Sequence, residues 1–298
     1  MIPMPTYSAY GLTLELPFPC PVLPLALENT TPHVVVVDGT VPCQLAAPVV
    51  EDKMWQAEPG RFLWRGGPRS GRFLIEDGRR ITLERNPAAE EELLASHFLD
   101  AVLAAVLRQR GMLVLHANAA VTPTGAVVVS GESGVGKSTT LAALMSRGCV
   151  MLADDITALR VGSDGRVQVL PGVPQLYLTE DAANGLGRDI AGLPLYRWQR
   201  MKAAVPAQAN MATQPAHLRA IYLLRSHPCA DVRVCELTGV EKFAAVQECV
   251  YGPLLPEEHP GQFPFFVAVT DQVAIYRIER PAGHWTVNDI VERILWTG

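Results

Sequence analysis

The chain has 298 residues, 49% of them hydrophobic, and a formal net charge of −5 at pH 7. This size predicts roughly two domains with buried cores, and the acidic balance argues against a general nucleic-acid surface, which needs clustered lysine and arginine. The six cysteines form no C-x-x-C or zinc-like pattern, and the longest apolar helix candidate, residues 93–107, is too short and polar to cross a bilayer. We therefore expect a cytoplasmic protein with reduced thiols and no membrane or nucleic-acid partner.

Residues 1–85 have the pattern of strands and turns and predict a small β-rich N-terminal domain. Residues 10–16 alternate between apolar and polar side chains, and residues 33–37 are mostly β-branched. The segment 76–79 separates two strand-like runs, as in a hairpin. Nothing in this domain resembles catalytic chemistry, so we expect a structural or partner-binding role.

Residues 86–111 predict a connecting helix. Asn86 can cap it, Pro87 fits its first turn, and the glutamates at residues 90–92 favour its positive end. Apolar side chains recur at helical spacing and predict a broad buried face, and Gly111 ends the pattern. The second predicted domain then spans residues 112–298.

The most informative stretch of this second domain is residues 131–139. It fits the pattern G-x-x-x-x-G-K-[ST] without mismatch, and it stands between an apolar run and a run free of helix breakers. This predicts a strand, a phosphate-binding loop and a helix, with backbone N–H groups around phosphate oxygens, the lysine on the β- and γ-phosphates and the serine on Mg²⁺. The alternative is a chance match in a glycine-rich turn. The expected nucleotide-binding residues are Gly131, Glu132, Ser133, Gly134, Val135, Gly136, Lys137, Ser138 and Thr139.

A second apolar run, residues 149–153, ends in Asp154 and Asp155, where a phosphate-loop protein keeps a magnesium-site carboxylate. Neighbouring side chains at a strand end point in different directions, so one can hold Mg²⁺ while the other takes a proton from an attacking hydroxyl. This favours phosphoryl transfer to an alcohol. His116, after the strand-like residues 112–115, could orient the base or the acceptor. The alternatives are a turn cap for the aspartates and a hydrogen-bonded core histidine.

Residues 184–210 lack a clean periodicity and could form a mobile loop over the site. The stretch holds four cations that could meet phosphate or an acidic substrate, although each is singly more typical of a solvated surface. These cations are Arg188, Arg197, Arg200 and Lys202.

Residues 115–117, 130–138, 147–148 and 152–155 together resemble the core of the bacterial HPr kinase/phosphorylase family. The resemblance is specific over residues 113–159. It implies an α/β P-loop kinase core of HPr kinase type and an ATP- and Mg²⁺-dependent protein-serine kinase. By this likeness the catalytic residues are Asp154 as general base, His116 as its partner and Lys137, and the metal-side residues are Ser138 and Asp155.

The chain also departs from that family. The HPr enzymes carry an Arg-Gly-Leu-Gly type segment downstream, whereas residues 170–178 read LPGVPQLYL, which puts phosphorolysis and HPr as the substrate in doubt. The N-terminal strands, the connecting helix and the Pro-Gly-Val-Pro bend are more similar to the HPr-kinase-like proteins of lasso peptide clusters, which phosphorylate the C-terminal serine of a precursor peptide.

The expected function is therefore ATP-dependent phosphorylation of a peptide serine hydroxyl. Three alternatives remain open: a kinase for a small alcohol or sugar, an HPr-like protein kinase, and an ATP sensor without catalysis. The resemblance also implies a possible homo-oligomer, because the HPr enzymes assemble through this core.

Overall fold

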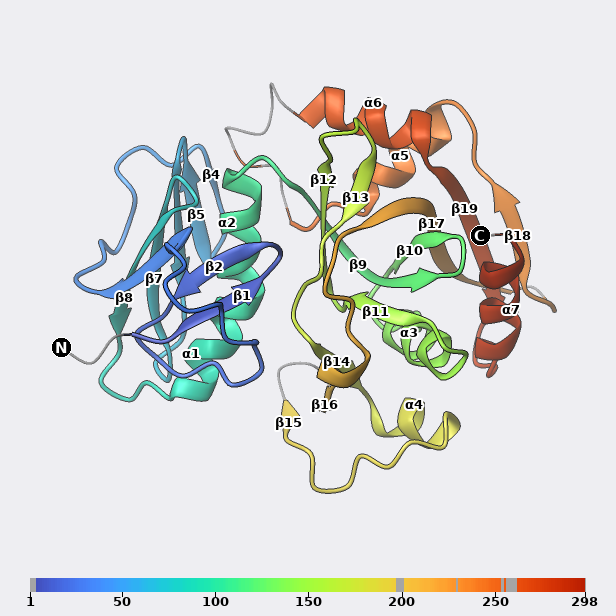
Figure 1. Ribbon diagram of the computed structural model, residues 1–298, viewed down its shortest axis with the longest axis horizontal. Helices are drawn as coiled ribbons and strands as arrows, with labels where there is room; N and C mark the ends of the chain where they lie inside the picture. The colour runs from blue at the N-terminus through green and yellow to red at the C-terminus, as the bar shows by residue number, and fades with distance from the viewer. Residues whose placement is uncertain (1–3, 197–200, 229, 253–254, 256–261, 298) are drawn as a thin grey trace. The chain divides into compact units, whose positions relative to one another are not determined.

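The computed structural model describes residues 4–196, 201–228, 230–252, 255 and 262–297. The chain is a mixed α/β protein that divides into two compact units, as the coarse fold class predicted (Figure 1). The first unit comprises residues 1–114 with 252–263, and the second comprises residues 115–251 with 264–298. The segment that the sequence placed between two domains thus groups with the N-terminal strands.

Eight described strands of the first unit form one sheet in the order β1-β2-β3-β8-β7-β6-β5-β4. The pairs β2–β3 and β3–β8 are parallel and the others are antiparallel. The expected hairpin joins β7 to β8, with Asp77 and Gly78 in left-handed conformation at its turn. The strands are β1 (Thr6–Ala9), β2 (Leu12–Glu15), β3 (Val34–Asp38), β4 (Val50–Glu51), β5 (Trp55–Glu58), β6 (Arg61–Arg65), β7 (Gly71–Glu76) and β8 (Arg80–Arg85).

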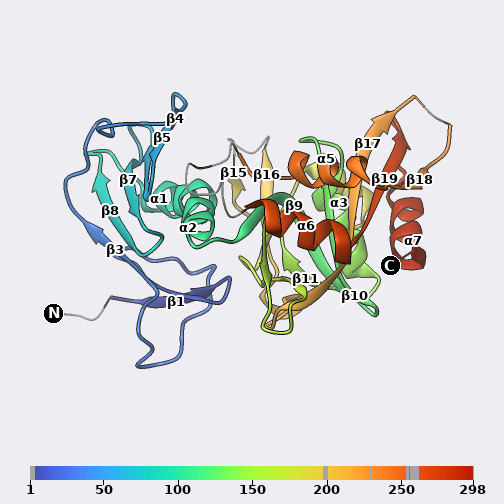
Figure 2. The same ribbon diagram turned by 90° about the horizontal axis from the view of Figure 1, so that it is seen from above.

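The predicted connecting helix is shorter than expected and is interrupted. It consists of α1 (Glu91–His97), a kinked segment η1 (Phe98–Val102) in which Asp100 leaves the helical conformation, and α2 (Leu103–Gln109). These segments run beside the sheet in Figure 2. Asn86 does not cap it, because its side chain donates a hydrogen bond to the Gly67 carbonyl instead. The helix is tied to the strands by Ser70 and His97, whose Oγ and Nδ1 atoms lie 2.8 Å apart.

The second unit is built on a larger mixed sheet in the order β10-β9-β12-β13-β17-β19-β18, with β11 paired to β9 and β10 also paired to β17. A separate antiparallel sheet has the order β14-β16-β15. The strands are β9 (Leu113–Thr122), β10 (Gly125–Gly131), β11 (Val150–Ala153), β12 (Ile156–Val161), β13 (Val167–Val169), β14 (Gln175–Leu178), β15 (Leu195–Tyr196), β16 (Lys202–Pro206), β17 (Ala216–His227), β18 (Arg233–Glu236) and β19 (Ala274–Pro281).

Strand β9 lies between β10 and β11 and is antiparallel to both. The sequence predicted a short strand ending at His116, and its length needs correction. Strand β9 continues for six residues beyond His116, because these residues are mostly small or apolar and pack on both faces of the sheet. The strand before the loop and the strand before the aspartates are therefore separated by a strand that carries His116.

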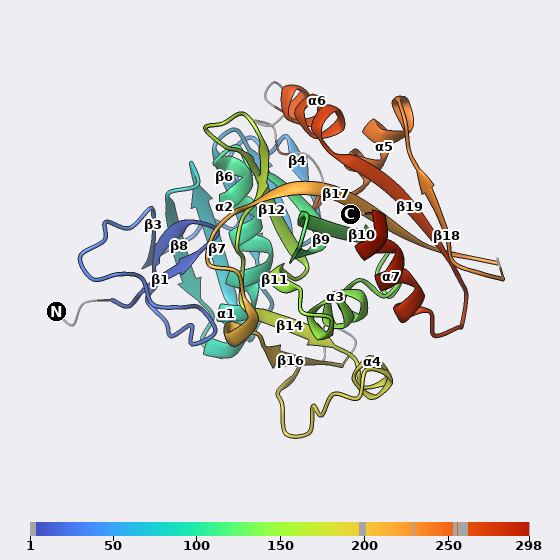
Figure 3. The same cartoon turned by 45° about the vertical axis from the view of Figure 1, so that its right-hand side comes forward.

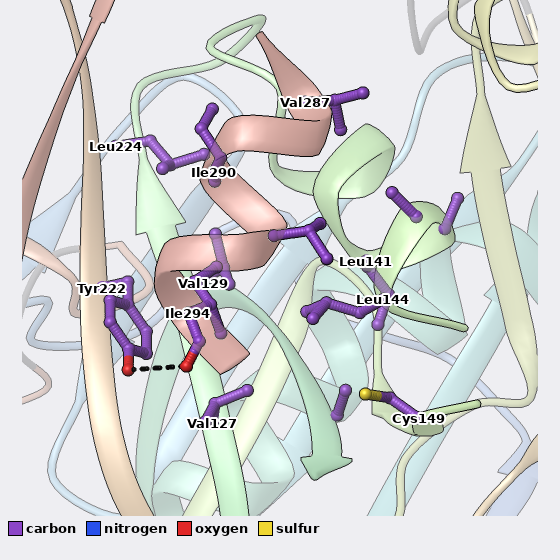
Figure 4. Close-up of a cluster of buried hydrophobic side chains, with 14 of the residues drawn as sticks. Val127, Val129, Leu141, Leu144, Cys149, Tyr222, Leu224, Val287, Ile290 and Ile294 are labelled. Carbon is purple, nitrogen blue, oxygen red and sulfur yellow. Dashed lines mark hydrogen bonds between the residues drawn. The ribbon is translucent and has the colours of Figure 1, made fainter. Parts of the chain in front are cut away.

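The described helices of the second unit are α3 (Lys137–Ser146), α4 (Glu180–Gly185), η3 (Gln208–Asn210, a 3₁₀ turn), α5 (Val240–Glu248), α6 (Gln262–Gln272) and α7 (Val287–Thr297). Helices α3 and α7 pack together on one side of β10 and β17, and Figures 1 and 3 place α5 and α6 on the other side. Aliphatic side chains of α3, α7, β10 and β17 interdigitate in one buried cluster (Figure 4). Within it, the Tyr222 hydroxyl donates to the Ile294 carbonyl at 3.3 Å. This core fixes the start of α3 against the end of β10.

Within the described ranges, no helix combines the length and the apolarity needed to cross a membrane. The five cysteines in these ranges are all free thiols, and Cys229 lies outside them.

The junction of β10 and the loop offers a stability test at Gly131. A Cβ on this residue would lie 2.4 Å from the Leu224 carbonyl oxygen of β17, whereas a Cβ on Gly148, also at positive φ, meets nothing within 4 Å. Both alanine variants should lose about 1 kcal/mol from the left-handed backbone. We expect Gly131→Ala to lose a further ~1–3 kcal/mol through the clash, measured by urea unfolding. Equal losses would contradict this account.

Candidate active site

The glycine-rich loop (residues 131–137) joins β10 to α3 in the predicted order of strand, loop and helix. Gly136 caps α3 at φ 110°, a conformation that side-chain-bearing residues rarely adopt, and no side chain caps the helix. The first N–H groups of α3 therefore have no partner within the helix, and the helix dipole favours an anion at this end. The Val135 side chain packs into the core, so this residue can offer only its backbone to a ligand.

Lys137 is buried and turned back on the loop. Its ammonium group donates to the Gly131 carbonyl at 2.8 Å and lies 3.0 Å from His116 Nε2. Because the ammonium can only donate, Nε2 must accept, which assigns the imidazole proton to Nδ1. Burial lowers the pKa of Lys137 and of His116. The histidine is consequently a neutral acceptor within reach of the lysine.

Asp154 lies beside Ser138 and is buried. The Ser138 hydroxyl donates to Oδ1 at 3.0 Å, and the Tyr177 backbone N–H donates to Oδ2 at 2.8 Å. Burial raises the pKa of Asp154 to about 7, the charge of Asp155 adds to the rise, and the Tyr177 N–H opposes it. Both carboxylate oxygens of Asp154 thus accept a hydrogen bond, one of them from Ser138 at the start of α3.

Asp155 points to a different partner because the chain turns sharply between β11 and β12. The Ile156 N–H donates to the Asp154 carbonyl at 2.9 Å, which closes a three-residue turn around Asp155 at φ 70°. The Asp155 carboxylate lies 3.2 Å from His116 Nδ1, and 29% of its side chain is exposed. A strained backbone at such a residue is typical of functional sites.

The two carboxylates thus have different partners in the structure. The sequence placed Asp155 with Ser138 on the metal side and Asp154 as the base, whereas Asp154 contacts Ser138 and Asp155 contacts His116. The three-residue turn is the physical reason, since it sends successive side chains to opposite sides of the corner.

Asn118 is a site residue that the sequence reasoning missed. It is buried, its Nδ2 donates to Ser138 Oγ at 3.3 Å, and its Oδ1 accepts the Asp155 N–H at 3.1 Å. A signal was present, because His116 and Asn118 alternate on one face of a strand that is otherwise apolar up to its last residue. Asn118 therefore links the Ser138 side chain to the backbone of Asp155.

The four candidate cations have different placements. Arg188 donates to the Ala142 carbonyl and to Ser146 at the far end of α3, and Arg197 and Arg200 lie outside the described residues. Lys202, on β16, acts on the site itself: beyond burial, its charge further lowers the pKa of His116 and Lys137 and opposes the rise at Asp154. Its strand pairs with β14, whose Tyr177 holds Asp154.

The chemistry of this donor set fits a magnesium-bound nucleotide. A glycine-rich helix start and a lysine held only by a histidine and carbonyls offer positive charge to phosphates. In the part of the chain that the structure describes, no three His, Cys, Asp or Glu side chains cluster as metal ligands. Ser138 and Asp154 alone would suit Mg²⁺, which usually takes one or two protein oxygens and completes its shell with phosphate and water.

No protein-family model matches the chain, and the search of curated proteins also found no match. Among solved structures, the chain is similar to the Hpr(Ser) kinase/phosphatase from Coxiella burnetii, with a TM-score of 0.33 and 13% sequence identity. The alignment covers 61% of this chain and 91% of that chain. The function therefore has to be inferred from the geometry of the site.

Strain at Asp155 can be measured by comparing two substitutions. Both Asp155→Gly and Asp155→Ala remove the carboxylate, but only glycine adopts φ 70° without a steric penalty. We expect the glycine variant to be more stable than the alanine variant by about 1 kcal/mol in urea unfolding. If the alanine variant is equally stable, the turn is not strained.

Proposed function

We propose that this chain is an ATP-dependent kinase that transfers the γ-phosphoryl group to a serine hydroxyl of a peptide. The observation that carries the proposal is the division of labour between two adjacent carboxylates. Asp154 accepts a hydrogen bond from Ser138 at the start of α3, and Asp155 faces a histidine that also contacts Lys137. A protein that only binds nucleotide needs one metal-side carboxylate, whereas transfer to an alcohol also needs a base.

Ser138 and Asp154 are the proposed metal-side residues. The metal-side role is assigned to Asp154, and not to Asp155 as the sequence resemblance implied. The reason is that Asp154 is buried and both of its oxygens already accept hydrogen bonds. An acceptor hydroxyl has no route to such a group. Mg²⁺ bound here would neutralise charge that develops on the phosphoryl oxygens, while Asn118 holds the serine hydroxyl in place.

Asp155 is the proposed general base, and His116 orients it. Asp155 is partly exposed, and the imidazole Nδ1 is its close side-chain neighbour. A substrate hydroxyl that approaches the γ-phosphate from the solvent side can donate its proton to this carboxylate. His116 constrains the orientation of Asp155 through the 3.2 Å contact between its Nδ1 and the carboxylate.

Lys137 and Lys202 are the proposed cations of the transfer. Phosphoryl transfer depends mainly on positioning and on neutralising charge at the phosphoryl oxygens. Lys137 starts in contact with carbonyl oxygens and a neutral histidine, none of which cancels its charge. Lys202 adds a second positive charge from β16, and its effect on three site residues supports its placement near the reacting groups.

The acceptor class comes from the sequence resemblance. The likeness to HPr-kinase-like proteins of lasso peptide clusters suggests a precursor peptide whose C-terminal serine is phosphorylated. The partly exposed side chain of Asp155 leaves its carboxylate accessible to the hydroxyl of such a peptide.

Phosphoryl transfer to a peptide can be measured directly. Incubation of the protein with ATP, Mg²⁺ and a precursor peptide should add one phosphoryl group to the terminal serine of the peptide, which intact-mass spectrometry detects. Asp155→Asn should lower kcat by about 10²–10⁴-fold and leave ATP affinity nearly unchanged, since the base does not hold the nucleotide. Asp154→Asn should weaken the Mg²⁺-dependent part of ATP binding. Asp181→Asn, on an exposed turn of α4, is the matched control.

The outcomes separate the open alternatives. Transfer to HPr but not to the peptide would identify a protein kinase of the HPr type, and transfer only to small alcohols would identify a metabolite kinase. ATP binding without transfer to any acceptor would contradict the kinase proposal and leave the sensor. Loss of transfer in Asp154→Asn with full activity in Asp155→Asn would reverse the proposed roles of the two aspartates.

The raised pKa of Asp154 predicts that nucleotide binding releases a proton. Because the pKa of Asp154 is about 7, this carboxyl is mostly protonated at pH 6 and must ionise to bind the metal. Binding of ADP in saturating Mg²⁺ should release close to one proton at pH 6 and little at pH 8.5. Calorimetry in buffers of different ionisation enthalpy measures this release. Asp155→Asn should release a smaller fraction of a proton at pH 6, because the charge of Asp155 contributes to the raised pKa of Asp154, and Asp154→Asn should release none; an unchanged release in Asp154→Asn would rule out Asp154 as its source.

A further inference from the structure

Arg280 lies at the end of β19 and contacts the glycine-rich loop. Its Nη1 donates to the Val135 carbonyl at 2.9 Å, and its Nη2 donates to the His284 carbonyl at 2.6 Å. Both acceptors are neutral backbone oxygens, so neither cancels the positive charge of the guanidinium. Neither the sequence motif nor the proposed chemistry uses this residue.

The contact with Val135 controls the direction of a neighbouring N–H group. The peptide bond between Val135 and Gly136 is trans, as are the other described peptide bonds, so its carbonyl and its N–H point in opposite directions. The Gly136 N–H therefore points away from the guanidinium that holds the Val135 carbonyl. Hydrogen bonding to the carbonyl also polarises the amide and makes its N–H a better donor.

The local fold places Arg280 for this role. Gly283 adopts φ 74° in the turn after β19, which returns the chain so that the His284 carbonyl faces the guanidinium. Strand β19 pairs with β17, and β17 pairs with β10 directly before the loop. The Nη1 atom lies 3.4 Å from the position that a Cβ on Gly136 would occupy, so the guanidinium packs closely on the peptide that it holds.

Arg280 Nε is buried and has no hydrogen-bond partner among the described residues. Seven other buried side-chain atoms of the described residues share this property, among them His116 Nδ1. The case for Arg280 therefore rests on its contact with the Val135 carbonyl and on its close packing against Gly136.

We propose that Arg280 is a positioning residue for the nucleotide phosphates: it orients the Val135–Gly136 peptide so that the Gly136 N–H faces them. The inference rests on the proposed function, because it requires that the glycine-rich loop bind a nucleoside di- or triphosphate. The guanidinium also adds a positive charge behind the loop, and it does not touch the reacting atoms.

Binding measurements on the full chain test this role. Arg280→Gln should weaken binding of ADP and of pyrophosphate, both in Mg²⁺, by a similar factor of about 10–100, since the lost interaction concerns only the phosphates. Arg280→Lys keeps one cationic donor and should recover part of this loss. In steady-state kinetics, Arg280→Gln should raise the KM for ATP by a larger factor than it lowers kcat. Arg277→Gln, three residues earlier on β19 and 3.8 Å from Glu241, is the matched control and should bind normally.

A spectroscopic readout separates positioning from general damage. In the wild-type chain, the Gly136 amide proton should shift downfield when pyrophosphate binds, and this shift should shrink in Arg280→Gln while the Gly134 amide still responds. If Arg280→Gln does not fold, Arg280→Lys and the wild-type Gly136 signal decide the matter. No Gly136 response in the wild type, or normal binding by the Arg280 variants, would overturn the inference alone. Failure of the wild-type chain to bind any nucleotide would overturn the proposed function and the inference with it.

Discussion

The arrangement of the candidate site depends on the buried amide of Asn118. It donates to the Ser138 hydroxyl and accepts the Asp155 N–H, so one side chain joins the start of α3 to the corner between β11 and β12. The strands that lead into these two segments, β10 and β11, lie on different sides of β9. A buried amide with both ends engaged fixes a distance, because moving either partner would leave a polar group without water or protein to bind. Lys137, His116 and the aspartates are placed around that link.

The two neighbouring carboxylates acquire different properties from one tight turn. Asp154 is drawn into the protein, where burial raises its pKa to about 7, and Asp155 remains partly exposed beside His116. Adjacent acidic groups in different environments are a common way to obtain a metal-side group and a base from the same residue type. The strained backbone at Asp155 is consistent with this division, since an unstrained corner would not send the two side chains apart.

The first unit is held together by a different kind of contact. Phe18 and Phe98 meet edge to face, Trp64 packs against His97, and Ser70 lies within hydrogen-bond distance of the same histidine. His97 and Ser70 are both at least partly buried, and burial lowers the pKa of the histidine. This pair ties the helical segment to the sheet, which is compatible with the structural or partner-binding role expected from the sequence.

The sequence by itself determined the local elements of the second unit. The glycine pattern specified a strand, a loop and a helix, and the apolar run before Asp154 specified a strand end, because turn residues and periodicity act over a few neighbours. It also selected His116, Lys137, Ser138 and both aspartates, which the fold does bring together. The N-terminal hairpin turn was equally local and was predicted for the same reason.

Only the tertiary structure decided which of these residues are partners. The placement of β9 between β10 and β11, the contact of Asp154 with Ser138, and the approach of Arg280 to Val135 across 145 positions of sequence all depend on strand pairing and on a turn of unusual backbone conformation. Sequence spacing carries little information about these features, because pairing over long separations is set by the packing of the whole unit rather than by neighbouring residues. The sequence therefore singled out residues that the fold brings together, whereas their contacts with one another depend on the tertiary structure.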